Sequence, residues 1–276
     1  MEDKKNKINS IIGQGLLIIF GFIQLFPLLW LLSFSLKQNH ELFGENILGL
    51  PQEMMWSNYI TAFSGSNLLL YFRNSIIVTG ITVLLSNVIS LMAAYALTRL
   101  QWKLSKAVYT FILLGLMIPV HAVLLPLFIS LDSVINTPLA LIIPYVAFAI
   151  PLSILILTGF LQGIPREIEE AAFIDGASLY KVFLTIILPL SKSVIATISI
   201  LTYLSSWNEL MFAITFIHDD RLKTLPFGII SMVGRYNTSW GPIGAALVLA
   251  TIPTLIIYLF MSDKIEKSLA AGAVKG

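Results

Sequence analysis

Long apolar runs separated by short polar connections are the main pattern of this chain. Each run has about 20 residues, the length that a helix needs to cross roughly 30 Å of hydrocarbon. The pattern predicts an all-α polytopic membrane protein, a bundle of about six transmembrane helices, because helices satisfy their own backbone hydrogen bonds in lipid. The predicted spans are Ile12–Leu36, Phe72–Leu97, Ser105–Leu131, Pro138–Leu161, Ser193–Ile217 and Gly241–Met261.

Composition supports the same class. Hydrophobic residues make up 57% of the 276 positions and charged residues 12%, with a mean hydropathy of +0.87. Soluble domains carry about 25% charged residues, so we expect a single transmembrane domain over residues 1–276. The absence of cysteine excludes disulfides, thiol catalysis and cysteine-bound metals. Prolines within the spans predict kinks at Pro27, Pro119, Pro126, Pro144, Pro151 and Pro253.

The basic residues predict an orientation. The net charge of +2 is too small to indicate a nucleic-acid partner. The side with more Lys and Arg is expected to be cytoplasmic, which places both termini inside. That side holds Lys4, Lys5, Lys7, Arg99, Lys103, Lys106, Arg166, Lys181, Lys192, Lys264, Lys267 and Lys275. The other side holds Lys37, Arg73, Arg221, Lys223 and Arg235, the last three in a fifth loop that runs against the trend.

The polar segment at about 162–192 separates the fourth and fifth spans. A charged residue at mid-depth in the bilayer costs about 2.5 to 3.5 kcal/mol, so we expect all charges of this segment to lie in cytoplasmic water. Pro165 suits a first helical position and Gly176 a helix stop, and Ser178 is suited to cap a second helix at the interface. The first helix carries a face of small and apolar residues flanked by carboxylates. By chemistry alone, this face suits either a partner protein or plain solvent.

A longer motif resembles a known family. Glu170-Ala171-Ala172 is followed after three residues by Gly176, then by Ile186 and by Leu188-Pro189. This spacing matches the EAA signature of permease subunits in binding-protein-dependent ABC importers. Trp207-Asn208-Glu209, Thr224-Leu225-Pro226 and the ending SLAAGAVKG resemble the MalG-like branch of carbohydrate permeases. The resemblance covers nearly the whole chain.

The resemblance implies a function and a set of partners. It implies a permease subunit in a bacterial cytoplasmic membrane, paired with a MalF-like permease, two copies of a cytoplasmic ABC ATPase and an extracytoplasmic sugar-binding protein. The EAA helix would couple to the ATPase. The implied contact consists of Glu167, Glu170, Ala171, Ala172, Asp175, Gly176 and Ala177.

The C-terminal tail, about 262–276, has two readings. From its small residues it is a frayed chain end. The resemblance instead implies that the tail reaches between the two ATPase subunits. The implied contact residues are Ala271, Gly272, Ala273, Lys275 and Gly276.

No enzymatic or metal motif occurs in the sequence. Without a G-x-x-x-x-G-K-[ST] loop the chain is expected to bind no cofactor itself, so that ATP and Mg²⁺ would belong to the partner ATPase. Glu209 is a carboxylate within a predicted span, where it would either line a path or anchor the fifth helix. Residues considered for the translocation path are Asn87, Tyr145, Asn208 and Glu209.

The same residues leave other functions to compare. Within the class, the alternative substrate is glycerol phosphate or another polyol derivative. A secondary transporter would need a network of intramembrane carboxylates, for which Glu209 is thin support. A membrane-embedded enzyme would need a nucleophile with its base or a metal cluster, and the sequence shows neither.

Overall fold

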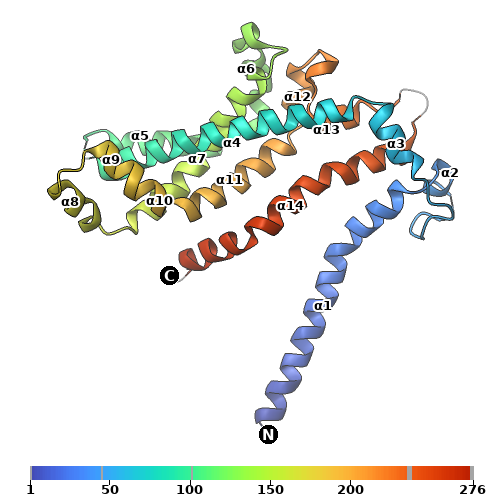
Figure 1. Ribbon diagram of the computed structural model, residues 1–276, viewed down its shortest axis with the longest axis horizontal. Helices are drawn as coiled ribbons and strands as arrows, with labels where there is room; N and C mark the ends of the chain where they lie inside the picture. Colours follow the sequence, from blue (N-terminus) through green and yellow to red (C-terminus); the bar gives the residue numbers. More distant parts are fainter. Residues whose placement is uncertain (1, 45, 101, 235–237, 274–276) are drawn as a thin grey trace. The chain divides into compact units, whose positions relative to one another are not determined.

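The computed structural model describes residues 2–44, 46–100, 102–234 and 238–273, with side chains described between residues 13 and 260 of these ranges. The described residues form helices joined by turns, without a strand among them (Figure 1). The chain divides into two compact units. The first consists of Met1–Leu68 with Ile229–Ile252, and the second of Leu69–Gly228 with Pro253–Gly276. The all-α class is therefore confirmed.

The first unit joins the end of the first helix to the start of the last. Its elements are α1 (Glu2–Ser35), α2 (Asn39–Leu42), α3 (Ser57–Ser64) and the first part of α14 (Trp240–Ala273). A Cβ added to Gly244 of α14 would lie 2.5 Å from the Phe34 ring of α1, so the two helices are in close contact there. Asn58 of α3 donates its amide hydrogens to the carbonyls of Ser35 and Lys37, at 2.9 and 3.0 Å. Helix packing and capping of the α1 end hold this unit together.

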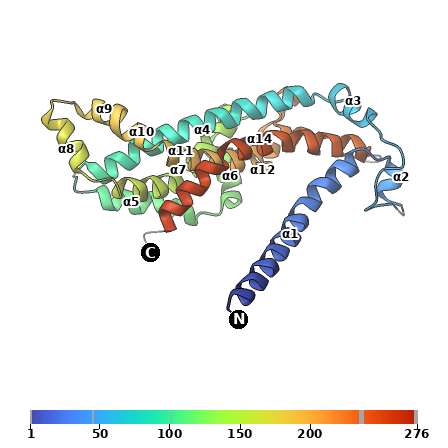
Figure 2. The same ribbon diagram turned by 60° about the horizontal axis from the view of Figure 1, so that its bottom comes forward.

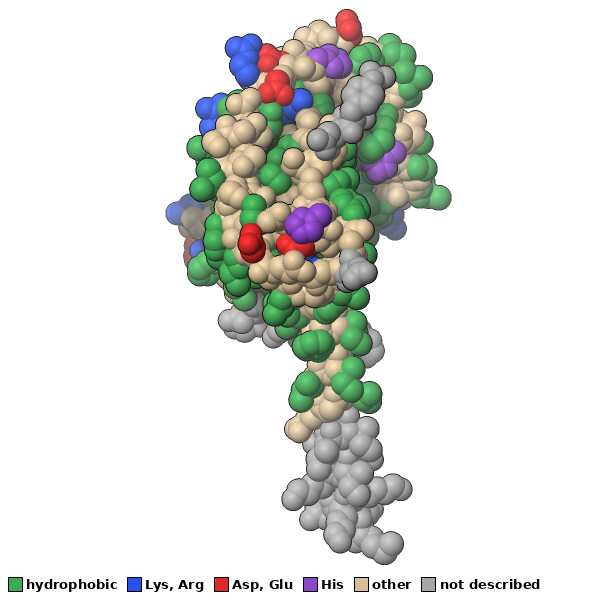
Figure 3. Space-filling model, turned by 90° about the vertical axis from the view of Figure 1, so that its right-hand side faces the viewer, with side chains coloured by type: hydrophobic (Ala, Val, Ile, Leu, Met, Phe, Trp, Pro, Cys, Tyr) green, Lys and Arg blue, Asp and Glu red, His purple; other side chains and the backbone are tan. Residues whose placement is uncertain are grey.

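The described part of α1 is apolar on all sides. Leu17 and Ile18 are 71% and 72% exposed, and none of the hydrophobic stretch within Gly13–Ser35 is buried. Figure 3 shows these hydrophobic side chains along the helix at the bottom of the view. Since such a surface is unfavourable in water, it indicates contact with lipid or with another membrane subunit.

The second unit is built around α7. Its other elements are α4 (Leu68–Arg99), α5 (Ser105–Leu114), η1 (Gly115–Met117), η2 (Val120–Val123), α6 (Leu124–Ser130), η3 (Asp132–Val134), α8 (Glu167–Ile174), α9 (Leu179–Val182), the π-helix η4 (Phe183–Ile187), α10 (Leu188–Leu190), α11 (Lys192–Trp207), α12 (Met211–Phe216), η5 (Asp220–Leu222) and the first part of α13 (Leu225–Ile230). The turned view in Figure 2 shows α4 to α12 of this unit from another side.

Buried side chains line both halves of α7 (Leu139–Gln162). Leu141 and Tyr145, in the first half, belong to a core cluster that includes Phe212 of α12. Leu157 and Leu161, in the second half, belong to a cluster with residues of α4, η4 and α11. Helix α7 therefore packs against the surrounding helices along both of its halves.

In the described residues, four continuous helices are long and apolar enough to span a membrane. The number reaches the predicted six only if each of two bent helix pairs counts as one span. Continuous helices cover 13–35, 68–99, 139–162 and 240–260. The predicted third span bends by 95° between Ser105–Met117 and Val120–Ser130, because Ile118 before Pro119 takes an extended conformation (φ −79°, ψ 118°). A 71° bend also separates 179–190 from 192–207.

The prediction of one fifth helix over Ser193–Ile217 is wrong. Helix α11 ends at Trp207 and α12 begins at Met211, with Asn208 as the C-cap of α11. Apolar composition runs straight through this region, so the break depends on polar side chains that bind the freed backbone groups. Pro27, Pro144, Pro151 and Pro253 lie within continuous helices.

Charges of the fifth loop are paired within the loop. Arg221 contacts Asp219 at 2.8 Å, and Lys223 contacts Asp220 at 2.8 Å. Hydrogen bonds from the Arg221 side chain and backbone lower the pKa of the Asp219 carboxyl. These two basic residues therefore serve the local fold of the loop. Arg235 lies outside the described residues.

We predict that Gly244→Ala destabilises the first unit. The added methyl would meet Phe34 at 2.5 Å and the Ser35 backbone at 3.1 Å, and such overpacking costs about 1 to 3 kcal/mol. Gly21→Ala in α1 is the matched control, because nothing lies within 4 Å of its added Cβ. Thermal denaturation in detergent should show a lower midpoint for Gly244→Ala alone. Equal midpoints for both variants would contradict the close helix contact.

Candidate functional site

The polar segment folds as a short helix with a defined stop. Gly176 takes φ +80°, a left-handed conformation that favours glycine. The N–H of Ala177 donates to Ala172 O at 2.9 Å and that of Gly176 to Phe173 O at 3.0 Å, the Schellman arrangement that closes a helix end. The predicted stop at Gly176 is therefore confirmed.

The first helix of the segment starts two residues later than predicted. Helix α8 begins at Glu167 with Arg166 as its N-cap, so Pro165 lies outside the helix rather than at its first position. Ser178 caps α9, as predicted, by accepting a hydrogen bond from the Lys181 N–H at 3.4 Å. Two short helices thus follow α7, joined by the turn at Gly176.

The predicted coupling residues lie on the outside of this segment. Glu167, Glu170, Ala171, Asp175 and Gly176 are exposed, whereas Ala172 and Ala177 are half-buried. Apolar side chains beside them are also exposed. Ile174 and Tyr180 are the most open, at 86% and 80%. The segment therefore presents a mixed acidic and apolar surface.

Glu169 departs from the prediction that all charges of the segment lie in water. It is only 5% exposed and is the buried residue of α8. Its Oε1 lies 2.7 Å from Arg99 Nε, and its Oε2 accepts a hydrogen bond from the Tyr95 hydroxyl at 3.0 Å. The Arg99 N–H points out of line with Oε1, so attraction between charges joins this pair more than a directed hydrogen bond does. These two partners compensate the cost of burying the carboxylate within the protein.

Arg99 also binds the end of α7. Its Nη2 donates to Leu161 O and Ile164 O, both at 2.8 Å. Sequence reasoning counted Arg99 only as an orienting charge and did not consider Tyr95. A signal was present: Tyr95 and Arg99 stand four residues apart at the end of a span, and this spacing places them on one helix face.

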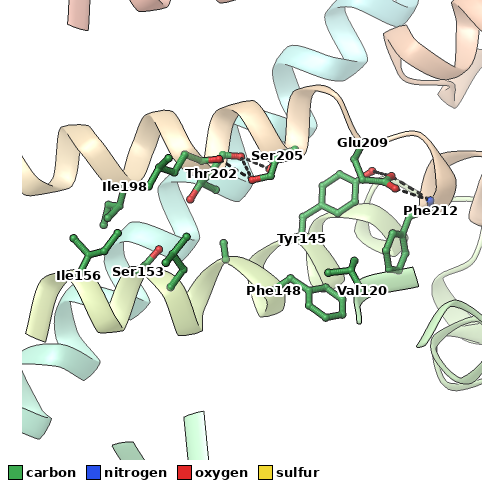
Figure 4. A pocket seen from close by; sticks show the side chains of 14 residues that line it. Val120, Tyr145, Phe148, Ser153, Ile156, Ile198, Thr202, Ser205, Glu209 and Phe212 are labelled. Carbon is green, nitrogen blue, oxygen red and sulfur yellow. Dashed lines mark hydrogen bonds between the residues drawn. The ribbon is translucent and has the colours of Figure 1, made fainter. Parts of the chain in front are cut away.

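A cavity of about 200 Å³ lies between α7 and α11 (Figure 4). Most of its lining is apolar. Hydroxyl groups enter it from Ser153 of α7 and from Thr202 and Ser205 of α11, and the side chains of the two helices face each other across it.

Glu209 closes one end of this cavity and anchors the helix break. The Tyr145 hydroxyl donates to Glu209 Oε2 at 2.6 Å. The N–H of Phe212 lies 3.0 and 3.1 Å from the two carboxylate oxygens, so Glu209 satisfies a free donor in the first turn of α12. The Glu209 carboxylate thus both lines the cavity and anchors the helix break, so it fits both alternatives that the sequence left open.

The structure does not bring all predicted path residues together. Tyr145 and Glu209 line the cavity, but Asn87 does not and instead donates to Ser199 Oγ at 2.7 Å, which joins α4 to α11. Asn208 is exposed and binds Leu204 O at 2.9 Å. A path role for these residues stays a prediction.

The predicted tail contact lies largely beyond the described part of the chain. Ala271, Gly272 and Ala273 have a helical backbone at the end of α14, with side chains outside the described residues. Lys275 and Gly276 lie outside the described residues altogether. The tail contact therefore stays a prediction.

Comparisons with known proteins agree with this geometry. The chain is 39% identical over 262 residues to a putative ABC transporter permease protein of Caldicellulosiruptor sp., covering 94% of this chain and 95% of the relative. It is 35% identical over 280 residues to the trehalose/maltose transport system permease protein MalG of Thermococcus litoralis, covering 100% and 99%. Both alignments span the residues of α8 and the residues that line the cavity.

A solved structure shares the fold. It is a bacterial ABC transporter involved in the import of alginate, with a TM-score of 0.81 at 22% identity, covering 94% of this chain and 97% of that one. Residues 86–271 match the model of the family described as binding-protein-dependent transport system inner membrane component. The chain belongs to this family of inner membrane transport components.

Proposed function

We propose that this chain is a membrane-spanning permease subunit of an ATP-driven sugar importer, in which it forms half of the translocation path. The observation that carries the proposal is α8, which holds the EAA residues on an exposed surface at one end of the membrane helices. The MalG relative supports the choice of sugars. The partners would be a MalF-like permease, two ATPase subunits and an extracytoplasmic binding protein.

The surface of α8 is suited to a protein partner in water. Glu167 and Glu170 are exposed in its first turn, and Ile168, Phe173 and Ile174 expose apolar area between them. Apolar groups with flanking charges are typical of protein interfaces, because the apolar part gains from burial and the charges fix the register. We infer that this surface docks on the ATPase.

The cavity supports a sugar as cargo. Ser153 and Thr202 offer hydroxyls that both donate and accept hydrogen bonds, and Tyr145 and Phe148 offer aromatic rings. The Ser205 hydroxyl donates to Leu201 O at 2.7 Å and can accept a hydrogen bond. Such a lining can exchange hydrogen bonds with sugar hydroxyls while a sugar passes. Since the other half of the path would come from the second permease, this lining is one wall of it.

The transport proposal predicts uptake that requires ATP. The chain, tagged at its N-terminus and purified with its partners from its own membranes, should import at least one of radiolabelled maltose, trehalose, melibiose and raffinose into proteoliposomes. Uptake should stop when ATP is replaced by a non-hydrolysable analogue. Uptake driven by an ion gradient, or uptake of glycerol 3-phosphate with none of the sugars, would contradict the proposal.

The docking proposal predicts that Gly176→Ala weakens binding of the ATPase. A residue with a Cβ at φ +80° costs about 1 to 2 kcal/mol, so the turn that ends α8 would shift. Gly159→Ala in α7 is the matched control, because nothing lies within 4 Å of its added Cβ and the helix requires no positive φ there. The measurement is the ATPase retained per tagged permease after washing. Retention that is the same in both variants would count against docking through α8.

The orientation proposal places both termini and α8 in the cytoplasm. The twelve basic residues on one side against five on the other support it, of the 17 in the chain. Alkaline phosphatase fused after Asn46 or Asn136 should be active outside, and a fusion after Ser178 should be inactive. Activity at Ser178 would place α8 on the wrong side for an ATPase.

A further inference from the structure

Helix α8 is attached to the helices beneath it through a charge. All its residues are described, and Glu169 alone among them is buried. Its large apolar residues, Ile168, Phe173 and Ile174, are exposed instead. A surface helix normally buries an apolar stripe. Because α8 does not, its position depends on Glu169, on its covalent connections and on its contact with α9. Its N-cap residue Arg166 adds a hydrogen bond to Thr98 O of α4 at 3.3 Å.

Two residues of α4 hold this carboxylate from one side. Arg99 approaches Oε1 and Tyr95 donates to Oε2, so each oxygen has its own partner. Both side chains are buried, with 7% of the Arg99 side chain and 6% of the Glu169 side chain exposed. Two separate contacts fix both the position and the rotation of the carboxylate. Removing one member would strand a buried charge, which proteins tolerate poorly.

Arg99 extends the junction to a third helix. Its Nη2 binds Leu161 O and Ile164 O at the end of α7, where a helix leaves carbonyls unpaired and negative. One guanidinium therefore contacts α7 and α8 from its place on α4. Figures 1 and 2 both show α8 beside the same end of α4 and α7. Helix α7 continues from this junction to Ser153 and Tyr145 in the cavity wall.

We propose that Arg99 is a positioning residue that transmits displacement of α8 to α4 and α7. A partner that moves α8 would pull on Glu169, and the guanidinium would pass this pull to the α7 end and so to the cavity wall. The inference rests on the proposed function, since α8 must be the contact with the ATPase. Arg99 and Glu169 are far apart in sequence, so this direct link between α8 and α4 comes from the ion pair and not from the covalent chain.

The test is the amount of sugar imported per ATP hydrolysed. The reconstituted complex would carry the double substitution Arg99→Met and Glu169→Leu, with radiolabelled maltose, trehalose, melibiose and raffinose as probes. Replacing both charges by apolar groups of similar volume is often neutral for folding, so the complex should assemble. We expect the ratio to fall at least about fivefold, the lower end of typical coupling between sites. An unchanged ratio would overturn the proposal.

A second measurement follows the junction directly. The chain has no cysteine, so spin labels at Ile174→Cys on α8 and Leu84→Cys on α4, both exposed, report one distance. The distribution of this distance should be narrow in the otherwise unchanged chain and broader in the double variant. A distribution that stays narrow would also overturn the proposal. If the unaltered complex imports no sugar, the proposed function fails, while the label distance still tests the junction.

The matched control is Arg221→Met. It removes one member of an ion pair of similar length, 2.8 Å, but the Arg221 side chain is 81% exposed and lies in a loop. This variant should keep the ratio and the narrow distance distribution. Loss of assembled complex in the Arg99 and Glu169 double variant would assign the pair a role in folding only, and would overturn the proposal.

Discussion

The structure depends on hydrogen bonds between polar side chains and the backbone groups that helix breaks leave free. In lipid no water satisfies such groups, so each break needs a partner from the protein. Arg99 binds the carbonyls at the end of α7, and Glu209 accepts the N–H of Phe212 at the start of α12. Asn136 accepts the N–H groups of His218 and Asp219 after α12, and Asn58 binds the carbonyls at the end of α1. These four polar residues thus satisfy backbone groups where helices stop.

These breaks also bring the functional elements together. The break before α12 places Glu209 against Tyr145 and closes one end of the cavity. The end of α7 lies at the junction with α4 and α8. Between the two, Leu157 and Leu161 of α7 pack in one cluster with buried residues of α4 and α11, which makes this part of the unit stiff. Packing of α7 against α4 and α11 thus connects the junction at α8 with the cavity wall.

Local sequence was sufficient for features that depend on a few neighbouring residues. The stop at Gly176 and the cap at Ser178 follow from backbone freedom and from a side-chain oxygen near free N–H groups. Apolar length located the first, second, fourth and sixth spans within several residues. The single helix predicted for the fifth span was wrong, and the burial of Glu169 within the protein was not predicted, because both depend on partners distant in sequence. Glu169 is stabilised by α4, and Glu209 supports a helix break that apolar composition conceals.

The sequence by itself determined the class of protein, its apolar spans, its EAA segment and the residues that family resemblance assigns to it. These follow from side-chain transfer to lipid and from short-range helix signals, which act without tertiary contacts. Only the tertiary structure decided which charge is buried, which polar residues share a cavity and which helix joins α8 to that cavity. The physical reason is that burying a charge or breaking a helix in an apolar surrounding is tolerated only beside a compensating group. In this chain those groups, Arg99 for Glu169 and Tyr145 for Glu209, come from helices far away in the sequence.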